Sequence, residues 1–186
     1  MPHFFFIFTY IFADTLKKEN SNMNNRLLDV KLAFKIYDKR KSSFIGNLIS
    51  IWTNSVYYHV ELIVGDHWIS SNSEAGGITI APLRELNYNW DYKHLGQIEL
   101  TESQYLNFVK FIDDNRTCKY DWLGILFSQV LPFRWNSKDK WFCSEIVTKL
   151  LQLLVVKEVN EVIPADMSPK DLAVLFNYNK KRFGKD

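Results

Sequence analysis

The sequence predicts a single α+β domain, and three observations support this prediction. Residues 56–64 are rich in β-branched and aromatic side chains, and Gly65-Asp66 follows them as a two-residue turn, which is typical of a β-hairpin. Two later segments, 102–114 and 143–154, carry apolar residues at three- and four-residue steps, as amphipathic helices do. With 186 residues, 47% of them apolar, the chain can build one full core but is too short for two.

Strands are expected mainly in the first hundred residues. The hairpin needs a return strand after its turn, and Pro82 ends a further β-rich stretch because proline lacks the N–H that a ladder uses. The expected strands are residues 32–37, 56–64, 67–71, 77–81 and 97–100.

Helices are expected before the hairpin and through the second half of the chain. Thr101 is the expected N-cap of the helix at 102–114, and Ser168 that of a last helix in which Pro169 takes the first position. The remaining expected helices are residues 44–52, residues 120–127 and the segment that begins at Cys143.

The amino terminus differs in character from the rest of the chain. Residues 4–12 form an apolar run that is too short to span a bilayer and lacks the positively charged leader of a secretory signal. We therefore predict no integral membrane span. Residues 1–22 are expected to be a disordered or non-native extension, through an internal-start artefact or a short export segment, and residues 23–186 to form the single domain.

Charge and cysteine content exclude several classes of function. A net charge of +2 gives no reason to expect a nucleic-acid partner. Two cysteines are too few for a disulfide framework, and their spacing does not match a zinc site. We expect no metal and no cofactor, and a cytoplasmic or virion-associated protein whose oligomeric state the sequence leaves open.

Cys143 is the first candidate catalytic residue, because it stands at the head of an apolar-periodic helix. Free N–H groups and the positive end of the helix dipole favour a thiolate there, and the thiolate is the reactive form of cysteine. The alternative is a small buried apolar residue beside Trp141 and Phe142. A histidine positioned to act as a base is what decides between the two interpretations.

His59 is the candidate base among four histidines. It lies within the predicted strand 56–64, where a rigid backbone can hold the imidazole in one orientation, as nucleophile activation requires. A purely structural strand histidine is the alternative. His3, His67 and His94 lie in the extension, beside the hairpin turn and in a polar turn-rich segment.

Four motifs taken in order resemble the circularly permuted NlpC-like papain fold, over roughly residues 30 to 176. They are the strand His-Val-Glu-Leu-Ile-Val at 59–64, Tyr120-Asp121, the helix start Phe-Cys-Ser-Glu at 142–145, and Ser-Pro-Lys-Asp at 168–171. The resemblance implies an antiparallel sheet or small barrel packed against helices, with Cys143 as nucleophile and His59 as general base. It also implies that Tyr120 and Asp121 line the substrate cleft, and the alternative is a structural role as a helix start with an anchoring aromatic residue.

The third catalytic member is predicted from hairpin register. The family places a polar residue on the strand after the histidine. If Val64 pairs with His67, then His59 lies opposite Asn72, and directly opposite residues share a face. Glu61 lies on the same face but one pleat away along its own strand. A register slip or bulge would substitute one of four nearby residues: Ser70, Ser71, Ser73 or Glu74.

The function implied by this resemblance is a thiol hydrolase that cleaves an amide or peptide bond through a Cys-His acyl-enzyme, with a peptide or peptidoglycan-like substrate. One alternative is a non-catalytic papain-like binding or assembly module, for instance a viral structural protein. A second is a lipid acyl transferase or esterase, whose relatives carry an Asn-Cys-Glu-His-Phe nucleophile motif that is absent here.

Overall fold

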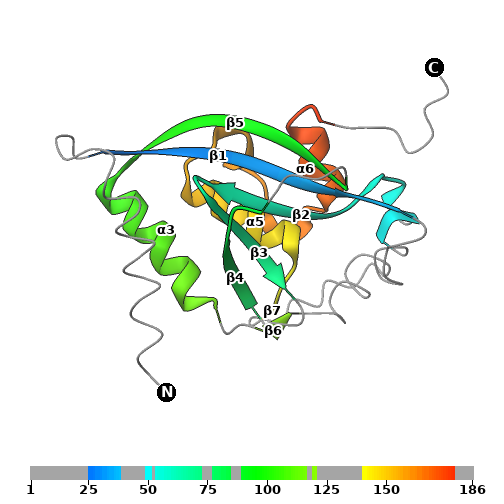
Figure 1. Ribbon diagram of the computed structural model, residues 1–186, viewed down its shortest axis with the longest axis horizontal. Coiled ribbons are helices and arrows are strands. Elements are labelled where there is room, and N and C mark those ends of the chain that lie inside the picture. The colour runs from blue at the N-terminus through cyan, green and yellow to red at the C-terminus, as the bar shows by residue number, and fades with distance from the viewer. Residues whose placement is uncertain are drawn as a thin grey trace.

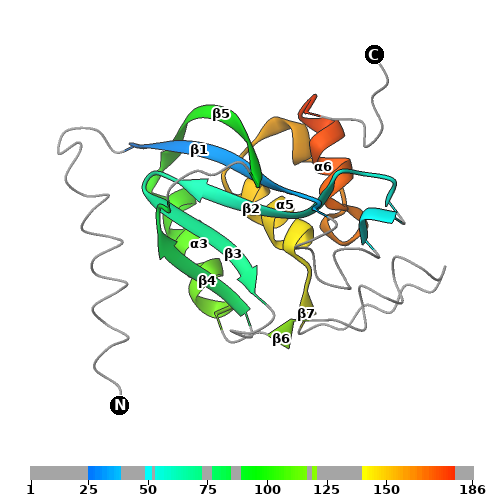
Figure 2. The same ribbon diagram turned by 45° about the vertical axis from the view of Figure 1, so that its right-hand side comes forward.

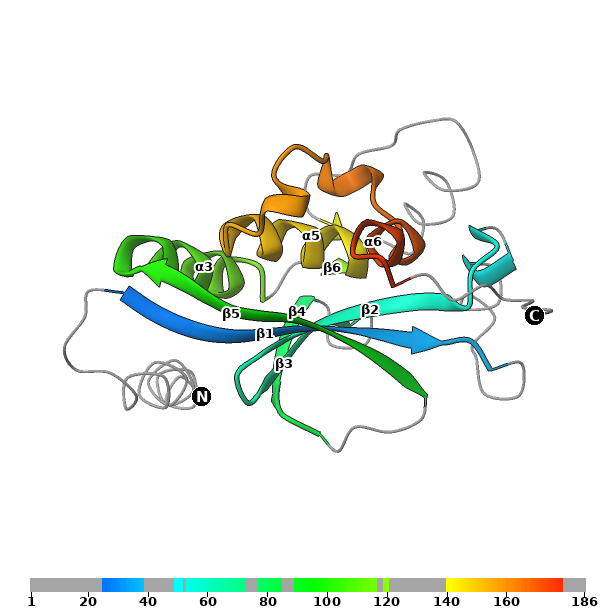
Figure 3. The same cartoon turned by 90° about the horizontal axis from the view of Figure 1, so that it is seen from above.

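A computed structural model describes residues 25–38, 49–51, 53–72, 77–84, 89–116, 119–120 and 140–178. Five antiparallel strands form one open sheet with the order β4-β3-β2-β1-β5, and helices cover one of its faces (Figures 1 and 3). The strands are β1 (Asn25–Ile36), β2 (Tyr57–Val64), β3 (His67–Asn72), β4 (Gly77–Pro82) and β5 (Trp90–Thr101). The α+β class with an antiparallel sheet is therefore confirmed.

The remaining elements follow the sheet in the chain. The helices are α3 (Glu102–Asp114), α5 (Cys143–Leu153) and α6 (Pro169–Leu175), with 3-10 turns η1 (Lys157–Val159) and η2 (Pro164–Asp166) between the last two. A separate parallel pair consists of β6 (Lys119–Tyr120) and β7 (Lys140–Trp141).

The hairpin of β2 and β3 forms as the sequence predicts. Gly65 takes a φ of +54° at the first turn position, where a two-residue turn of type II′ favours glycine. Val64 then pairs with His67, so the predicted register is confirmed at the turn. Beyond the pair Leu62–Ile69 the ladder between β2 and β3 ends, and Figure 2 shows β3 diverging from β2.

Strands β1 and β5 are longer than predicted. The sequence suggested residues 32–37 and 97–100, whereas the strands span Asn25–Ile36 and Trp90–Thr101. Both continue through polar residues on the uncovered face, such as Asp29 of β1 and His94 of β5, which contact each other there. Antiparallel strands that are covered on one face tolerate such alternation, and a search for apolar stretches misses it.

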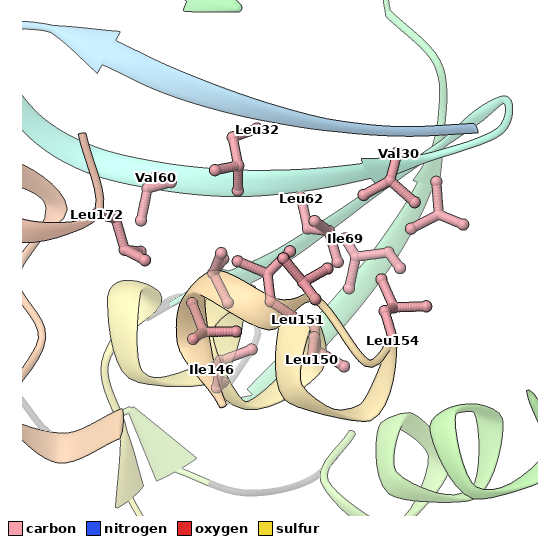
Figure 4. Close-up of a cluster of buried hydrophobic side chains, with 14 of the residues drawn as sticks. Val30, Leu32, Val60, Leu62, Ile69, Ile146, Leu150, Leu151, Leu154 and Leu172 are labelled. Atoms are coloured by element: carbon pink, nitrogen blue, oxygen red, sulfur yellow. The ribbon is translucent and has the colours of Figure 1, made fainter. Parts of the chain in front are cut away.

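The main core lies between the sheet and α5, as Figure 4 shows. Alternate residues of β1 and β2 face the helices, and leucines of α5 spaced three and four apart meet them. Fully buried members of this core include Leu32, Val60, Leu62, Ile146, Leu150 and Leu151. This packing fixes the direction of α5 and with it the place of Cys143.

A second, smaller apolar cluster lies on the opposite face of the sheet. Ala33, Ile63 and Trp68 are buried there, and Trp90 and Tyr92 pack against them. The Trp68 ring centre lies 5.2 Å from that of Trp90 and 6.1 Å from that of Tyr92. We call this side of the sheet the aromatic face.

Two of the predicted helix starts are confirmed in detail. Thr101 caps α3, and the Gln104 side chain reciprocates by accepting from the Thr101 N–H. Ser168 caps α6 with the same geometry, since its hydroxyl accepts from the Asp171 N–H while the Asp171 carboxylate accepts from the Ser168 N–H.

Of the two other predicted helices, one is observed in part and the other is not observed among the described residues. Residues 49–51 and 53 are helical, and the rest of the predicted helix at 44–52 lies outside the described residues. The prediction of a helix at 120–127 is wrong at its start, because Tyr120 lies in β6 and pairs with Trp141. Residues 121–127 lie outside the described part of the chain.

None of the helices within the described ranges combines the length and the apolarity that crossing a bilayer would require.

Candidate active site

Cys143 is the first residue of α5, as the sequence predicts, and its side chain is 5% exposed. Phe142 is the N-cap residue but offers no side-chain acceptor. Glu145 stabilises the helix start instead. Its carboxylate accepts the Phe142 N–H at 3.3 Å and adds a negative charge to the first turn. The N–H groups of the first turn remain available to an anion at the Cys143 sulfur.

The divergence of β3 from β2 makes room for the thiol. On the side of the Leu62–Ile69 pair away from the turn, the edge of β2 forms no hydrogen bonds with β3. The N–H groups of β2 that point to this edge therefore need another acceptor. Val60 donates its N–H to the Cys143 sulfur, and Ser144 donates a second N–H from within α5. The sulfur therefore lies against the open edge of β2, held by two backbone donors.

His59 lies on β2, on the aromatic face. A bulge opposite Lys35 and Ile36 inserts Tyr58 as an extra residue, so that Tyr57 faces the helix-covered core while His59 does not. The ring centre of His59 lies 6.1 Å from that of Trp90, in an edge-on arrangement. From this position the imidazole hydrogen-bonds the thiol of Cys143.

The pKa values of the two groups shift in opposite directions. Burial alone would raise the pKa of Cys143, but the charge and hydrogen bond of His59 and the N–H groups of Val60 and Ser144 outweigh it and hold that pKa below its ordinary value. Burial likewise opposes the charged imidazole. Cys143 and then the Glu61 carboxylate overcome it and raise the pKa of His59 to about 10. The pair therefore favours thiolate and imidazolium.

Glu61 is the partner of His59, although the sequence predicted that its side chain points along the sheet and away from the ring. Nε2 of His59 lies 3.1 Å from Glu61 Oε1, which leaves Nδ1 as the ring nitrogen for the thiol. The side chains of Glu61 and His59 are 8% and 19% exposed. Two residues on one strand stand one pleat apart, about 6.6 Å, and the lengths of the imidazole and the carboxylate together bridge that gap.

Arg84 holds the other oxygen of the same carboxylate. Its Nη2 donates to Glu61 Oε2 at 3.2 Å, and its guanidinium lies 4.9 Å from the centre of the Trp68 ring. Glu61 thus connects a cation at the surface with the imidazole inside. Nothing in the spacing of the sequence singles out Arg84, because it follows β4 and reaches Glu61 only through the fold.

The other predicted third members do not contact His59 in the described residues. The β2–β3 ladder stops before it reaches Asn72, whose side chain, with residues 73 and 74, lies outside the described part. The prediction for Asn72 therefore stays untested, as do those for Ser73 and Glu74. Ser71 alternates onto the face of Ile69, away from His59, and the Ser70 hydroxyl is 3.0 Å from that of Thr79.

Of the two predicted cleft residues, Tyr120 and Asp121, the structure describes only the backbone of Tyr120. Tyr120 pairs with Trp141, which precedes Cys143 by two residues in the chain. Its side chain and the whole of Asp121 lie outside the described residues, as does Cys118. Within the described ranges, no group of three His, Cys, Asp or Glu side chains could hold a metal ion.

The site thus joins a thiol, an imidazole, a carboxylate and a guanidinium in a single chain of contacts. A thiol beside an oriented imidazole can attack an electrophilic carbonyl, and backbone N–H groups beside the sulfur can stabilise negative charge. No protein-family model matches the chain, and a search of the curated proteins found no match.

Proposed function

We propose that this protein is a thiol hydrolase that cleaves an amide or peptide bond through an acyl-enzyme on Cys143. One observation carries the proposal: a buried thiol at the start of α5 shares a hydrogen bond with an imidazole whose other nitrogen is held by a buried carboxylate. A purely structural cysteine has no need of this arrangement, in which the pKa of the thiol falls and that of the imidazole rises.

The acylation step follows from these contacts. The Cys143 thiolate adds to the carbonyl carbon, and the electron pair of the C=O bond moves to oxygen. Before attack, the N–H groups of Val60 and Ser144 stabilise the sulfur. We expect them also to stabilise the negative charge that develops on the carbonyl oxygen, because the carbonyl carbon becomes bonded to that sulfur. The electron pair on oxygen then re-forms the C=O bond as the C–N bond breaks, and the His59 imidazolium gives its proton to the leaving nitrogen.

The deacylation step uses the same groups in reverse. His59, now neutral, accepts a proton from water, whose oxygen attacks the thioester carbon. The sulfur leaves as thiolate, and the imidazolium forms again beside it. Glu61 stabilises the imidazolium at both stages through its bond to Nε2, and Arg84 orients that carboxylate through its own hydrogen bond.

The order of the elements supports a permuted papain-like fold as the framework of this site. The histidine strand β2 precedes the cysteine helix α5, and the helix packs against an antiparallel sheet. The capped start of α6 at Ser168 and Asp171 matches the last motif of that resemblance. The substrate that this framework favours is a peptide, with cell-wall peptide as the leading class.

The proposal is tested with an activated acyl donor and with cell-wall peptides. A 4-nitrophenyl ester should release a stoichiometric burst of nitrophenolate from the wild type, with the acyl group on Cys143 in the intact mass. Mass spectrometry of digested peptidoglycan stem peptides should then show new fragments. A Cys143→Ser variant should give neither signal.

The other outcomes separate the alternative functions. A burst without cleavage of any amide would favour an esterase or acyl transferase over a peptidase. No burst from folded wild-type protein would contradict catalysis and favour a binding or assembly module. The Cys118→Ser variant is the matched control, and it should behave like the wild type.

A further inference from the structure

Lys35 lies in one row with the residue of the proposed catalytic imidazole, across three strands. Lys35 of β1 pairs with His59 of β2 on one side and with Trp90 of β5 on the other. Directly opposite residues of antiparallel strands point to the same face, with Cβ atoms about 5 Å apart. The three side chains therefore share the aromatic face.

The cation and the imidazole both contact one indole ring. Lys35 Nζ lies 5.4 Å from the centre of the Trp90 ring, and the His59 ring centre lies 6.1 Å from it. The ammonium also lies 5.8 Å from the centre of the Tyr58 ring. Aromatic faces hold a cation in place but leave its charge uncompensated.

The pairing of Lys35 differs from that of its neighbour on the same strand and face. Lys31, two pleats away, forms an ion pair with Asp29 at 2.6 Å. Among the described residues, Lys35 has no carboxylate partner, although it is half-buried between two aromatic rings. An ammonium held in this way can bind a negative charge that another molecule brings.

We propose that Lys35 binds a carboxylate of the substrate close to the scissile carbonyl, and so selects acidic or carboxyl-terminal peptide segments. This inference rests on the function proposed above, because it places the carboxylate relative to Cys143 and His59. A single ammonium between two rings suits a monoanion with an apolar stem. A phosphate group usually requires several N–H donors.

The experiment compares two alkylating reagents that differ only in charge. Iodoacetate carries a carboxylate bonded directly to the carbon that the thiolate attacks. Iodoacetamide carries a neutral amide in the same place. Both attack the same thiolate, so the ratio of their rates at Cys143 cancels any change in thiolate fraction. In Lys35→Met the iodoacetate-to-iodoacetamide ratio should fall roughly three- to tenfold below that of the wild type, as expected for losing one nearby charge.

Two matched variants distinguish charge from packing. Lys35→Arg keeps the cation and should keep the ratio, whereas Lys31→Met removes a paired lysine from the same strand and should leave the ratio unchanged. An unaltered ratio in Lys35→Met would overturn the inference, as would an equal fall in Lys31→Met. An ordinary thiol pH profile with iodoacetamide alone would instead contradict the proposed function, and the ratio would still report on Lys35.

Discussion

At the scale of single residues, Glu61 is central because it is a buried carboxylate between two cations. Its oxygens lie 3.1 Å from the His59 ring and 3.2 Å from the Arg84 guanidinium. A buried carboxylate is costly without such partners, and with them it stabilises the charged form of the imidazole. The protonation of the Cys143 thiol therefore depends on Glu61, which acts through His59.

Replacing Glu61 with Gln should make Cys143 less reactive in mild acid. Without the carboxylate, the pKa of His59 falls, the imidazolium supports the thiolate less, and the pKa of Cys143 rises. The iodoacetamide rate at about pH 6 should drop about tenfold, since one hydrogen bond to a charged group is worth about 1.5 kcal/mol.

The control for that variant is Glu99→Gln. Glu99 is an exposed carboxylate that accepts from Asn25 at 3.0 Å. Its loss should leave the rate at Cys143 unchanged. If Glu61→Gln has the same pH profile as the wild type, the carboxylate has no influence on the pair.

The sequence could identify the nucleophile and the base but not the third member. Cys143 and His59 carry signals that need no tertiary knowledge, namely a helix start and a position within a strand. Glu61 lies two residues from His59 on the same strand, where regular geometry separates side chains by about 6.6 Å. Only the fold reveals that both side chains lean together where β3 has left the edge of β2.

At the scale of elements, the start of α5 and the open edge of β2 make the site together. Neither the helix nor the strand alone supplies both N–H donors to the sulfur, because Val60 belongs to β2 and Ser144 to α5. Apolar periodicity predicted α5 and α3 well. It did not predict the lengths of β1 and β5, because charged residues such as Asp29 and Lys93 interrupt the apolar signal.

The Ser168 motif is predicted to act through stability and not through chemistry. Ser168→Ala removes the acceptor of the Asp171 N–H and should cost about 1 kcal/mol, which lowers Tm by roughly 2–4 °C in a chain of this size. Differential scanning calorimetry measures the shift. The iodoacetamide rate at Cys143 should stay at the wild-type value.

A second capping box gives the comparison for this prediction. Thr101→Ala removes the acceptor of the Gln104 N–H at the start of α3 and should lower Tm by a similar amount. If Ser168→Ala reduced the alkylation rate strongly while Tm stayed unchanged, the motif would belong to the site itself.

At the scale of the whole molecule, one core holds the cysteine helix against the histidine strand. Leu150 is fully buried in it, with Leu62 of β2 and Ile69 of β3 in the same cluster. The geometry between Cys143 and His59 is therefore a property of sheet-to-helix packing, and reactivity should depend on that packing being intact.

Leu150→Ala should lower the free energy of unfolding by about 2–5 kcal/mol, as expected for a truncated core leucine. Urea denaturation measures this loss. Leu106→Ala on α3, where the leucine is 55% exposed, should change the free energy of unfolding by less than about 0.5 kcal/mol. Equal costs for the two variants would contradict the core described here.

The central claim is that Cys143 and His59 form a thiolate–imidazolium pair, and alkylation across pH tests it most directly. Iodoacetamide at about pH 6 should label Cys143 much faster than Cys118, because a lowered thiol pKa moves the rise in rate to lower pH. His59→Asn should move that rise to higher pH. Equal and slow labelling of both cysteines, or a profile that His59→Asn leaves unchanged, would contradict the claim.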